Sequence, residues 1–215
     1  MQRIIIFANG DLPDINKTRA ILQDDDYIIC ADGGSRHASS LDLKPALVIG
    51  DMDSTDKELL KKLREEGVSI ELFPRDKDET DLELAISKAI ELNAREIVIV
   101  AALGGRLDHT LANIALLNHV RLATLDVRLD DGVEEIFFCR DQAEVEGRIG
   151  DIVSLMPWQG EVTGVQTENL KWKLDSETLH PEKTRGISNE MTADVARIKI
   201  SKGLLLIVHT RKSQR

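Results

Sequence analysis

The sequence predicts an α/β protein with an N-terminal, mainly parallel Rossmann-like sheet and flanking helices, followed by a C-terminal antiparallel β-sandwich. Up to about residue 120, short β-branched runs alternate with segments of helical periodicity, which is typical of a parallel sheet covered by helices. Beyond that residue, short stretches alternate between apolar and polar positions and are separated by glycines, as in antiparallel sheets. We therefore expect two domains, residues 1–120 and residues 121–215.

Strands of the first domain are expected at five apolar runs that end in polar or glycine-rich residues: Ile4–Ala8, Tyr27–Ala31, Leu47–Gly50, Val68–Leu72 and Ile97–Leu103. Helices are expected where apolar residues recur every three or four positions, at Lys57–Glu66, at Leu82–Asn93 and around Leu111, Ile114 and Leu117. In parallel sheets of this kind, ligands bind at the carboxyl ends of the strands. The loops that follow the predicted strands are therefore the places to search for chemistry.

Strands of the second domain are expected at six stretches: Leu125–Leu129, Val133–Phe138, Ile152–Met156, Val162–Val165, Leu170–Leu174 and Val195–Ile200. The two cysteines, Cys30 and Cys139, lie in apolar, strand-like segments and lack the spacing of a metal site. We expect both to be reduced thiols in the core.

The charge balance argues against several classes of function. The chain has 215 residues with 38 Asp and Glu against 28 Lys and Arg, a formal net charge of -10, and only 3% aromatic residues. A nucleic-acid-binding protein needs a basic surface, and a membrane-surface protein is disfavoured on the same ground. No apolar stretch approaches the roughly 20 residues that span a bilayer, and the start lacks the apolar region of a signal peptide. We expect a cytoplasmic protein with neither nucleic acid nor membrane as a partner.

The first candidate site segment is Asp32, Gly33 and Gly34, directly after the second predicted strand. The glycines would permit a tight turn whose backbone N–H groups face an anion. A structural alternative has Asp32 capping the next helix.

The second candidate segment contains Asp51 and Asp53, just past the third predicted strand. Two carboxylates one residue apart can face one point, as a hard divalent cation that holds phosphate oxygens requires. The loop lacks the pattern of a calcium-binding EF-hand, so Mg²⁺ is the better assignment. Alternatively, Asp51 serves a turn, and Asp53 or Ser54 caps the following helix.

The third candidate segment opens the helix predicted over Leu82–Asn93. Thr80 and Glu83 form a capping box, and Asp81 suits the positive end of the helix dipole. Capping does not explain the dense charge of Lys77 and Asp78.

The fourth candidate segment follows the last strand of the first domain. Gly104 and Gly105 would let the backbone approach a ligand, and Arg106 offers a guanidinium fork for phosphate. Asp108 can cap a helix or hold a metal, and His109 is either a site residue or a helix-start residue.

Several aspartates are expected at the same edge of one sheet, and their combined charge must be neutralised: Asp32, Asp51, Asp53, Asp78, Asp81 and Asp108. Mg²⁺ with a nucleotide polyphosphate, assisted by Arg106 and Lys77, would neutralise them. The sequence contains no P-loop and no G-x-G-x-x-G fingerprint, so the ordinary mono- and dinucleotide motifs do not apply.

In their order and spacing, these motifs resemble the thiamine pyrophosphokinase family. The matching segments are Ala31–Gly34, Gly50–Ser54, Lys77–Asp81 and Leu103–Asn113, with Leu170–Trp172 and Gly186–Asn189 in the C-terminal half. The resemblance implies an α/β domain that binds ATP and Mg²⁺, a β-sandwich that binds thiamine, and a homodimer with active sites at the subunit interface. It implies transfer of a pyrophosphoryl group from ATP to the hydroxyethyl oxygen of thiamine, which gives AMP and thiamine diphosphate.

The resemblance also implies a role for each matching residue. Asp51, Asp53 and Asp81 would hold Mg²⁺, with Asp32 and Asp108 near the metal and phosphates. The residues expected around ATP are Asp32, Gly33, Gly34, Lys77, Asp78, Thr80, Gly104, Gly105, Arg106 and His109. Ser188 and Asn189 would contact thiamine from the partner subunit.

Three questions stay open at the level of sequence. Either Asp81 or Asp108 could accept the proton of the alcohol. Either Trp172 or Trp158 could stack on the cationic thiamine ring, although a tryptophan in an alternating strand is more often part of the core. The same ATP residues would also serve a kinase or pyrophosphokinase for another small alcohol such as a pterin, or a regulatory module that binds Mg-ATP without turnover.

Overall fold

The computed structural model describes residues 2–212. The chain divides into two compact units, Met1–Gly132 and Val133–Arg215. The predicted boundary at residue 120 falls inside the first unit. Residues 121–132 belong there because they include strand β6 (Asp126–Asp130), which pairs in parallel with β5 (Ala94–Val100).

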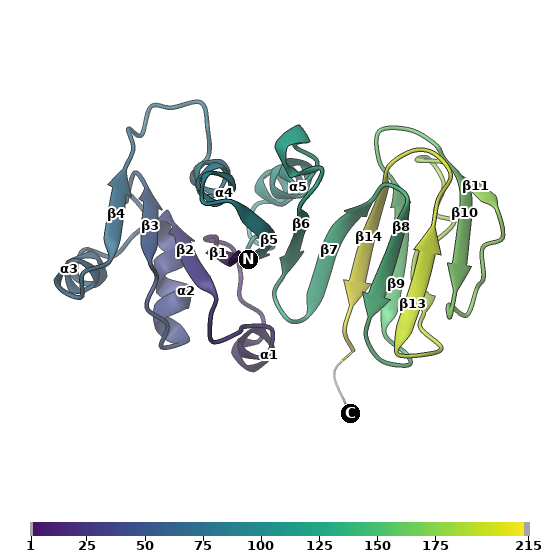
Figure 1. Ribbon diagram of the computed structural model, residues 1–215, viewed down its shortest axis with the longest axis horizontal. Coiled ribbons are helices and arrows are strands. Elements are labelled where there is room, and N and C mark those ends of the chain that lie inside the picture. Colours follow the sequence, from purple (N-terminus) through teal and green to yellow (C-terminus); the bar gives the residue numbers. More distant parts are fainter. Residues whose placement is uncertain (1, 213–215) are drawn as a thin grey trace. The chain divides into compact units, whose positions relative to one another are not determined.

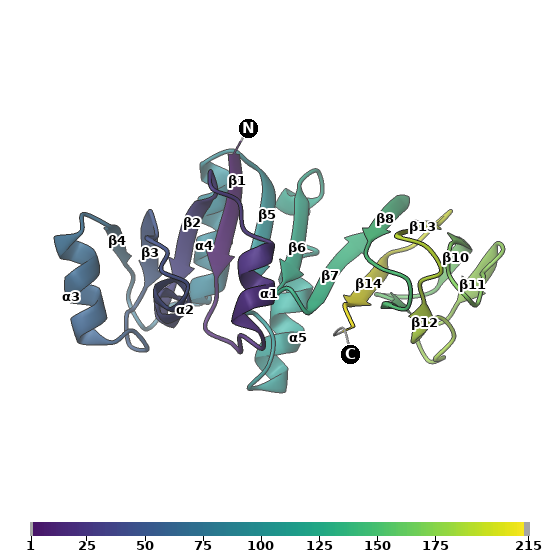
Figure 2. The same ribbon diagram turned by 90° about the horizontal axis from the view of Figure 1, so that it is seen from below.

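The first unit is built on a parallel sheet. Its other strands are β1 (Gln2–Phe7), β2 (Tyr27–Ala31), β3 (Leu47–Gly50) and β4 (Ser69–Leu72). The order is β6-β5-β1-β2-β3-β4, and every neighbouring pair runs parallel. Figure 2 shows these strands side by side. Because the central strands are buried on both faces, they are continuous runs of apolar residues such as Ile4–Phe7.

Helices cover both faces of this sheet: α1 (Ile15–Ala20), α2 (Ser35–Ser40), α3 (Lys57–Glu65), α4 (Asp81–Glu91) and α5 (Leu107–Leu116). Figure 1 shows α4 and α5 on one face and α1 and α2 on the other. Two short 3₁₀ turns, η1 (Asp32–Gly34) and η2 (Val120–Leu122), complete the unit. The side chains of Asp14, Asp56 and Thr80 accept hydrogen bonds from the first backbone N–H groups of α1, α3 and α4.

The second unit consists of two antiparallel groups of strands that share a core. One group has the order β12-β9-β14-β7 and the other β11-β10-β13-β8. Buried side chains from both groups pack together, including Leu155 of β9, Val165 of β10 and Ile207 of β14. The strands are β7 (Glu134–Cys139), β8 (Gln142–Glu146), β9 (Ile152–Pro157), β10 (Val162–Glu168), β11 (Glu177–Leu179), β12 (Asn189–Glu190), β13 (Val195–Lys199) and β14 (Leu205–Thr210). The predicted fold class is confirmed.

One predicted strand is wrong. Leu170–Leu174 forms only an isolated bridge, between Leu170 and Met191. Asn169 has a φ of 60°, and Leu174 exchanges hydrogen bonds with Thr167, so the chain folds back on β10. Both leucines are buried, so the apolar alternation reflected burial rather than an extended backbone.

Both cysteines are free and buried, as expected. Burial raises the pKa of the Cys139 thiol to about 11 and that of Cys30 further still. Among the helices of the described residues, none has the length and apolar character needed to cross a membrane.

Candidate active site

A cleft of about 650 Å³ lies at the carboxyl edge of the parallel sheet. This volume is typical of sites for small molecules. Its walls come from the loops that follow all five strands from β1 to β5, as the position of these loops in a parallel sheet predicts. The predicted site residues that line it are Asp32, Asp53, Lys77, Thr80, Asp81, Gly104, Gly105, Arg106, Asp108 and His109.

Three carboxylates form a cluster beside this cleft. Asp32, Asp51 and Asp53 each offer an oxygen, and these oxygens lie within 4.8 Å of one another. Asp32 is only 4% exposed, and it accepts hydrogen bonds from Ser54 N at 3.0 Å and Thr55 Oγ1 at 2.7 Å. These donors fix the Asp32 carboxylate, so it does not cap α2. Asp56 caps α3, which removes the alternative in which Asp53 or Ser54 serves as the cap.

Asp81 adds a fourth carboxylate, and Gly50 makes room for it. A Cβ at Gly50, whose φ is +146°, would lie 2.9 Å from Asp81 Cγ and 3.0 Å from Asp32 Cβ. Asp81 Oδ1 is closed to solvent and lies 2.9 Å from Lys77 Nζ. Within residues 2–212, no hydrogen bond of good geometry reaches this oxygen. A buried oxygen in that position fits a metal ligand.

The electrostatics around Asp81 favour the arrival of positive charge. Burial raises the pKa of the Asp81 carboxyl, and the charges of Asp51 and Asp32 raise it further, while Lys77 opposes them. The four carboxylates have two cationic partners, Lys77 beside Asp81 and Arg75 at 3.4 Å from Asp53, so negative charge remains uncompensated. The donors are all carboxylate oxygens, which are the ligands that Mg²⁺ prefers. The residues present thus fit the predicted divalent cation.

The loop between β5 and α5 has the open backbone expected of a phosphate-binding segment. Gly104 and Gly105 have φ values of 83° and 64°, and a side chain at Gly104 would overlap the carboxylate of Asp11. Both glycines are exposed in the cleft. The loop is tied to α5 by Asn113 Nδ2, which donates to the carbonyl of Ala102 at 2.7 Å.

Arg106 and Asp108 form a two-point ion pair at the mouth of the cleft. Arg106 Nε lies 3.1 Å from Asp108 Oδ1, and Nη2 lies 2.5 Å from Oδ2. The Arg106 hydrogen bonds lower the pKa of Asp108 to about 2. In this arrangement Asp108 is a weaker base than Asp81. It also does not cap α5, since Arg106 occupies the N-cap position.

Three of the residues predicted to contact ATP lie outside the cleft lining. Gly33 and Gly34 are buried and do not line the cleft. A side chain at Gly34 would overlap the carbonyl oxygen of Phe7, so this glycine lets η1 pack against the end of β1. Asp78 is exposed on the loop before α4 and also lies outside the lining.

The loop after β1 supplies cleft residues that the sequence reasoning missed, namely Asn9, Gly10 and Asp11. Backbone hydrogen bonds from Gly10 N to Ala101 O (2.7 Å) and from Asp11 N to Leu103 O (2.8 Å) join this loop to the one after β5. Their position directly after a predicted parallel strand could have identified them.

The second unit has its own pocket, of about 700 Å³, and all three predicted thiamine residues line it: Trp172, Ser188 and Asn189. Trp172 is 50% exposed, and Lys171 Nζ lies 4.9 Å from its ring centre. Trp158 instead packs edge-on against Phe138, with ring centres 5.5 Å apart. Of the two tryptophans, Trp172 is the one available to a ligand.

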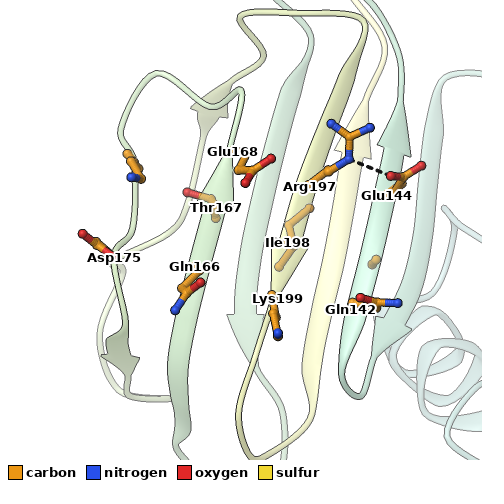
Figure 3. A pocket seen from close by; sticks show the side chains of 11 residues that line it. Gln142, Glu144, Gln166, Thr167, Glu168, Asp175, Arg197, Ile198 and Lys199 are labelled. Carbon is orange, nitrogen blue, oxygen red and sulfur yellow. Dashed lines mark hydrogen bonds and ion pairs between the residues drawn. The ribbon is translucent and has the colours of Figure 1, made fainter.

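A further hollow of about 530 Å³ lies on the outer face of β8, β10 and β13 (Figure 3). Consecutive residues of each strand line it, and Arg197 Nε pairs with Glu144 Oε1 at 2.8 Å. None of the residues singled out by the sequence lies in it.

Comparison with known proteins agrees with this division of the chain. Residues 18–129 match the family profile described as "Thiamin pyrophosphokinase, catalytic domain", and residues 141–205 match "Thiamin pyrophosphokinase, vitamin B1 binding domain". Thiamine pyrophosphokinase of Bacillus subtilis (strain 168) is 25% identical over 212 residues, which cover 98% of this chain and 99% of that protein. Thiamine pyrophosphokinase 1 of Oryza sativa subsp. japonica is 25% identical over 85% of this chain and 78% of its own.

Solved structures share the fold. The crystal structure of the B. subtilis thiamine pyrophosphokinase has a TM-score of 0.88 at 24% identity, covering 99% of this chain and 100% of its own. That of a thiamin pyrophosphokinase from Geobacillus thermodenitrificans has a TM-score of 0.85 at 25% identity, covering 100% and 99%. On these matches, the chain belongs to the thiamin pyrophosphokinase family of enzymes.

Proposed function

We propose that the protein transfers the pyrophosphoryl group of ATP to the hydroxyethyl oxygen of thiamine, and that it does so in the cytoplasm, where ATP and Mg²⁺ are available. A bond forms between the alcohol oxygen and the β-phosphorus, and the bond from that phosphorus to the α-phosphate oxygen breaks. AMP leaves, thiamine diphosphate forms, and the alcohol proton passes to a carboxylate of the site. Asp81 and Asp108 are the two candidate acceptors, and each is paired with a cation of the site, Lys77 and Arg106 respectively.

The observation that carries this proposal is the carboxylate cluster beside the cleft. Asp51, Asp53 and Asp81 would hold Mg²⁺, and the buried Asp32 would orient the cluster through its bonds to Ser54 and Thr55. When bound, Mg²⁺ neutralises the triphosphate and fixes its shape, so that AMP leaves in line with the attacking oxygen.

The chain's own residues supply the rest of the positioning of ATP. Lys77 and Arg106 provide cations on opposite loops of the cleft, each now paired with a carboxylate that a phosphate can replace. The exposed backbone of Gly104 and Gly105 lines the cleft beside Arg106. Thr80, the N-cap of α4, lines it as well. Holding reactants in register is the main source of catalysis in phosphoryl transfer.

We propose that thiamine binds through the pocket of Trp172 and Ser188, and that the protein is a homodimer in which this pocket and the carboxylate cleft come from different subunits. An exposed indole attracts a cationic ring through its π face. The family profile matched by residues 141–205, which names a vitamin B1 binding domain, supports this assignment.

The reaction is tested by incubating the enzyme with thiamine and Mg-ATP and separating the nucleotide products. We expect equal amounts of AMP and thiamine diphosphate. Formation of ADP would identify a γ-phosphoryl kinase. AMP that forms with a pterin alcohol but not with thiamine would identify another acceptor. Mg-ATP binding without any turnover would identify a regulatory module, and each of these three results would contradict the proposal.

A further inference from the structure

The side chain of Asn189 is committed to hydrogen bonds within the second unit. Its Oδ1 accepts from Trp172 N at 3.0 Å and from Glu190 N at 2.9 Å, and its Nδ2 donates to Trp172 O at 2.8 Å. An amide has two donors and two acceptor sites, so three of its four hydrogen-bonding positions are filled. Asn189 is only 3% exposed, which leaves little of it for a ligand.

The two bonds to Trp172 form a closed ring with the backbone of that residue. One amide side chain satisfies both the N–H and the C=O of Trp172, as a neighbouring strand would. Residues 170–174 belong to no strand. The Asn189 side chain therefore satisfies the backbone N–H and C=O of Trp172 that a neighbouring strand would otherwise satisfy.

Glu190, the other residue of β12, influences the same indole through Lys171, which lies beside the ring. Its carbonyl accepts from Lys171 N at 2.9 Å, and its Oε2 lies 3.0 Å from Lys171 Nζ. That ammonium lies 4.9 Å from the centre of the Trp172 ring. The carboxylate thus holds Lys171 near one side of the ring, and the remaining exposed surface of the indole is available to a flat cationic ligand.

We propose that Asn189 is a positioning residue for Trp172 and does not itself contact the substrate. With Glu190 it fixes the backbone and the ring of the tryptophan, so that the half-exposed indole is rigid before a cationic aromatic ring arrives. This inference rests on the proposed position of thiamine. The physical gain is preorganisation, because an indole that is already ordered loses less conformational entropy on binding.

The test uses a Trp158→Phe background, in which Trp172 is the only tryptophan. Asn189→Ala, Asn189→Asp and Trp172→Ala are compared in that background. Gln166→Ala is the matched control, since it removes an exposed amide of the same unit that donates to Ser176 Oγ on the outer face of β10 (Figure 3). The readouts are acrylamide quenching of Trp172 fluorescence, thermal unfolding, and the KM values for thiamine and ATP.

Asn189→Ala is expected to increase the quenching of Trp172 and to raise the thiamine KM about tenfold relative to the Trp158→Phe protein. The ATP KM is expected to stay within about twofold of its value in that protein. Asn189→Asp keeps the acceptor for Trp172 N but turns the donor to Trp172 O into a carboxylate oxygen, which repels that carbonyl, so it is also expected to increase the quenching and the thiamine KM. It provides a second test of the same hydrogen bonds if thermal unfolding shows that the alanine variant is unstable. Gln166→Ala is expected to change neither the quenching of Trp172 nor the thiamine KM.

Two results would overturn the inference, and they are distinguishable. A raised thiamine KM with unchanged quenching in Asn189→Ala would mean that Asn189 contacts the substrate directly. An unchanged thiamine KM in Trp172→Ala would instead overturn the proposed position of thiamine, whatever the Asn189 variants do.

Discussion

Asp81 Oδ1 is a buried oxygen beside one ammonium, within a group of carboxylates that outnumber their cations. An arrangement of this kind is costly for the protein alone, because like charges at short range repel one another and oppose folding. It becomes favourable when a divalent cation binds. At the scale of the residue, this charge balance supports the proposed binding of a divalent cation in the cleft.

The first prediction concerns the paired aspartates. Asp51→Asn and Asp53→Asn are each expected to lower Mg²⁺-dependent kcat/KM at least about a hundredfold, because each removes a charged ligand from the proposed metal. Thermal unfolding should show that the fold is retained. Activity is measured over a range of Mg²⁺ concentrations.

The control for these variants is Glu65→Gln, which removes an exposed carboxylate from α3. It is expected to keep the parental Mg²⁺ dependence. If Asp51→Asn and Asp53→Asn also keep that dependence, the metal assignment is wrong.

At the scale of the element, Gly34 and Gly67 of the first unit are required for two different physical reasons. Gly34 has an ordinary φ of -58°, yet a side chain there would overlap the Phe7 carbonyl. Gly67 has a φ of +80°, and a Cβ there would meet nothing within 4 Å. Glycine is needed at the first for close approach and at the second for backbone conformation.

These demands predict different costs for alanine. Gly34→Ala is expected to lower the free energy of unfolding by about 3 kcal/mol, because either β1 or η1 must move. Gly67→Ala is expected to cost only about 1 kcal/mol, the penalty for a positive φ. Urea unfolding at neutral pH measures both, and equal losses would show that the packing of η1 against β1 is looser than described.

A buried carboxylate directly before β9, that of Asp151, contributes a pH-dependent part of the folding stability. Asp151 accepts hydrogen bonds from Lys212 N and Arg148 N, each at 2.9 Å, and lies 3.3 Å from His209 Nε2. Burial raises the pKa of Asp151, but these bonds together outweigh it and hold the pKa below its ordinary value. The folded state thus binds the proton less tightly than the unfolded chain does. The stability contributed by Asp151 is present above its unfolded-state pKa and is lost as the pH falls through its folded-state pKa.

Asp151→Asn is therefore expected to lower the free energy of unfolding at pH 7 and to weaken its decline below about pH 4. The measurement is urea unfolding of both proteins from pH 7 to pH 3. Glu182→Gln, which alters an exposed carboxyl of the same unit, is the control. Parallel pH profiles for Asp151→Asn and the parent would contradict the role assigned to this carboxylate.

At the scale of the whole molecule, the proposed homodimer makes a quantitative prediction. Asp51→Asn is expected to disable the ATP cleft, and Trp172→Ala the thiamine pocket. If each active site combines one subunit's cleft with its partner's pocket, a heterodimer of the two variants has one intact site and one doubly damaged site. The heterodimer is then expected to have about half of the parental activity, since one of its two sites is intact.

The two variants are coexpressed with different affinity tags, and the mixed species is purified through both. Each variant alone is expected to be nearly inactive. Absence of any recovered activity in the mixed species would mean that cleft and pocket are not shared between subunits in this way.

Much of the fold follows from local pattern. Tyr27–Ala31 and Leu47–Gly50 were predicted to the residue as strands, and Thr80 as a helix cap, because continuous burial and capping are properties of short segments. Leu170–Leu174 was predicted wrongly, since burial alone does not distinguish an extended strand from a segment folded back on β10.

The sequence by itself determined the fold class, the sheet edge at which the aspartates gather, and the family to which the chain is similar. These follow from periodicity and from the rule that parallel strands end at one edge. Only the tertiary structure decided how each residue is used there. It assigned Gly34 to packing and left Asp78 exposed outside the cleft lining, it buried Asp81 Oδ1 beside Lys77, and it committed the Asn189 amide to Trp172. Such roles depend on contacts between residues far apart in the chain, which no local pattern specifies.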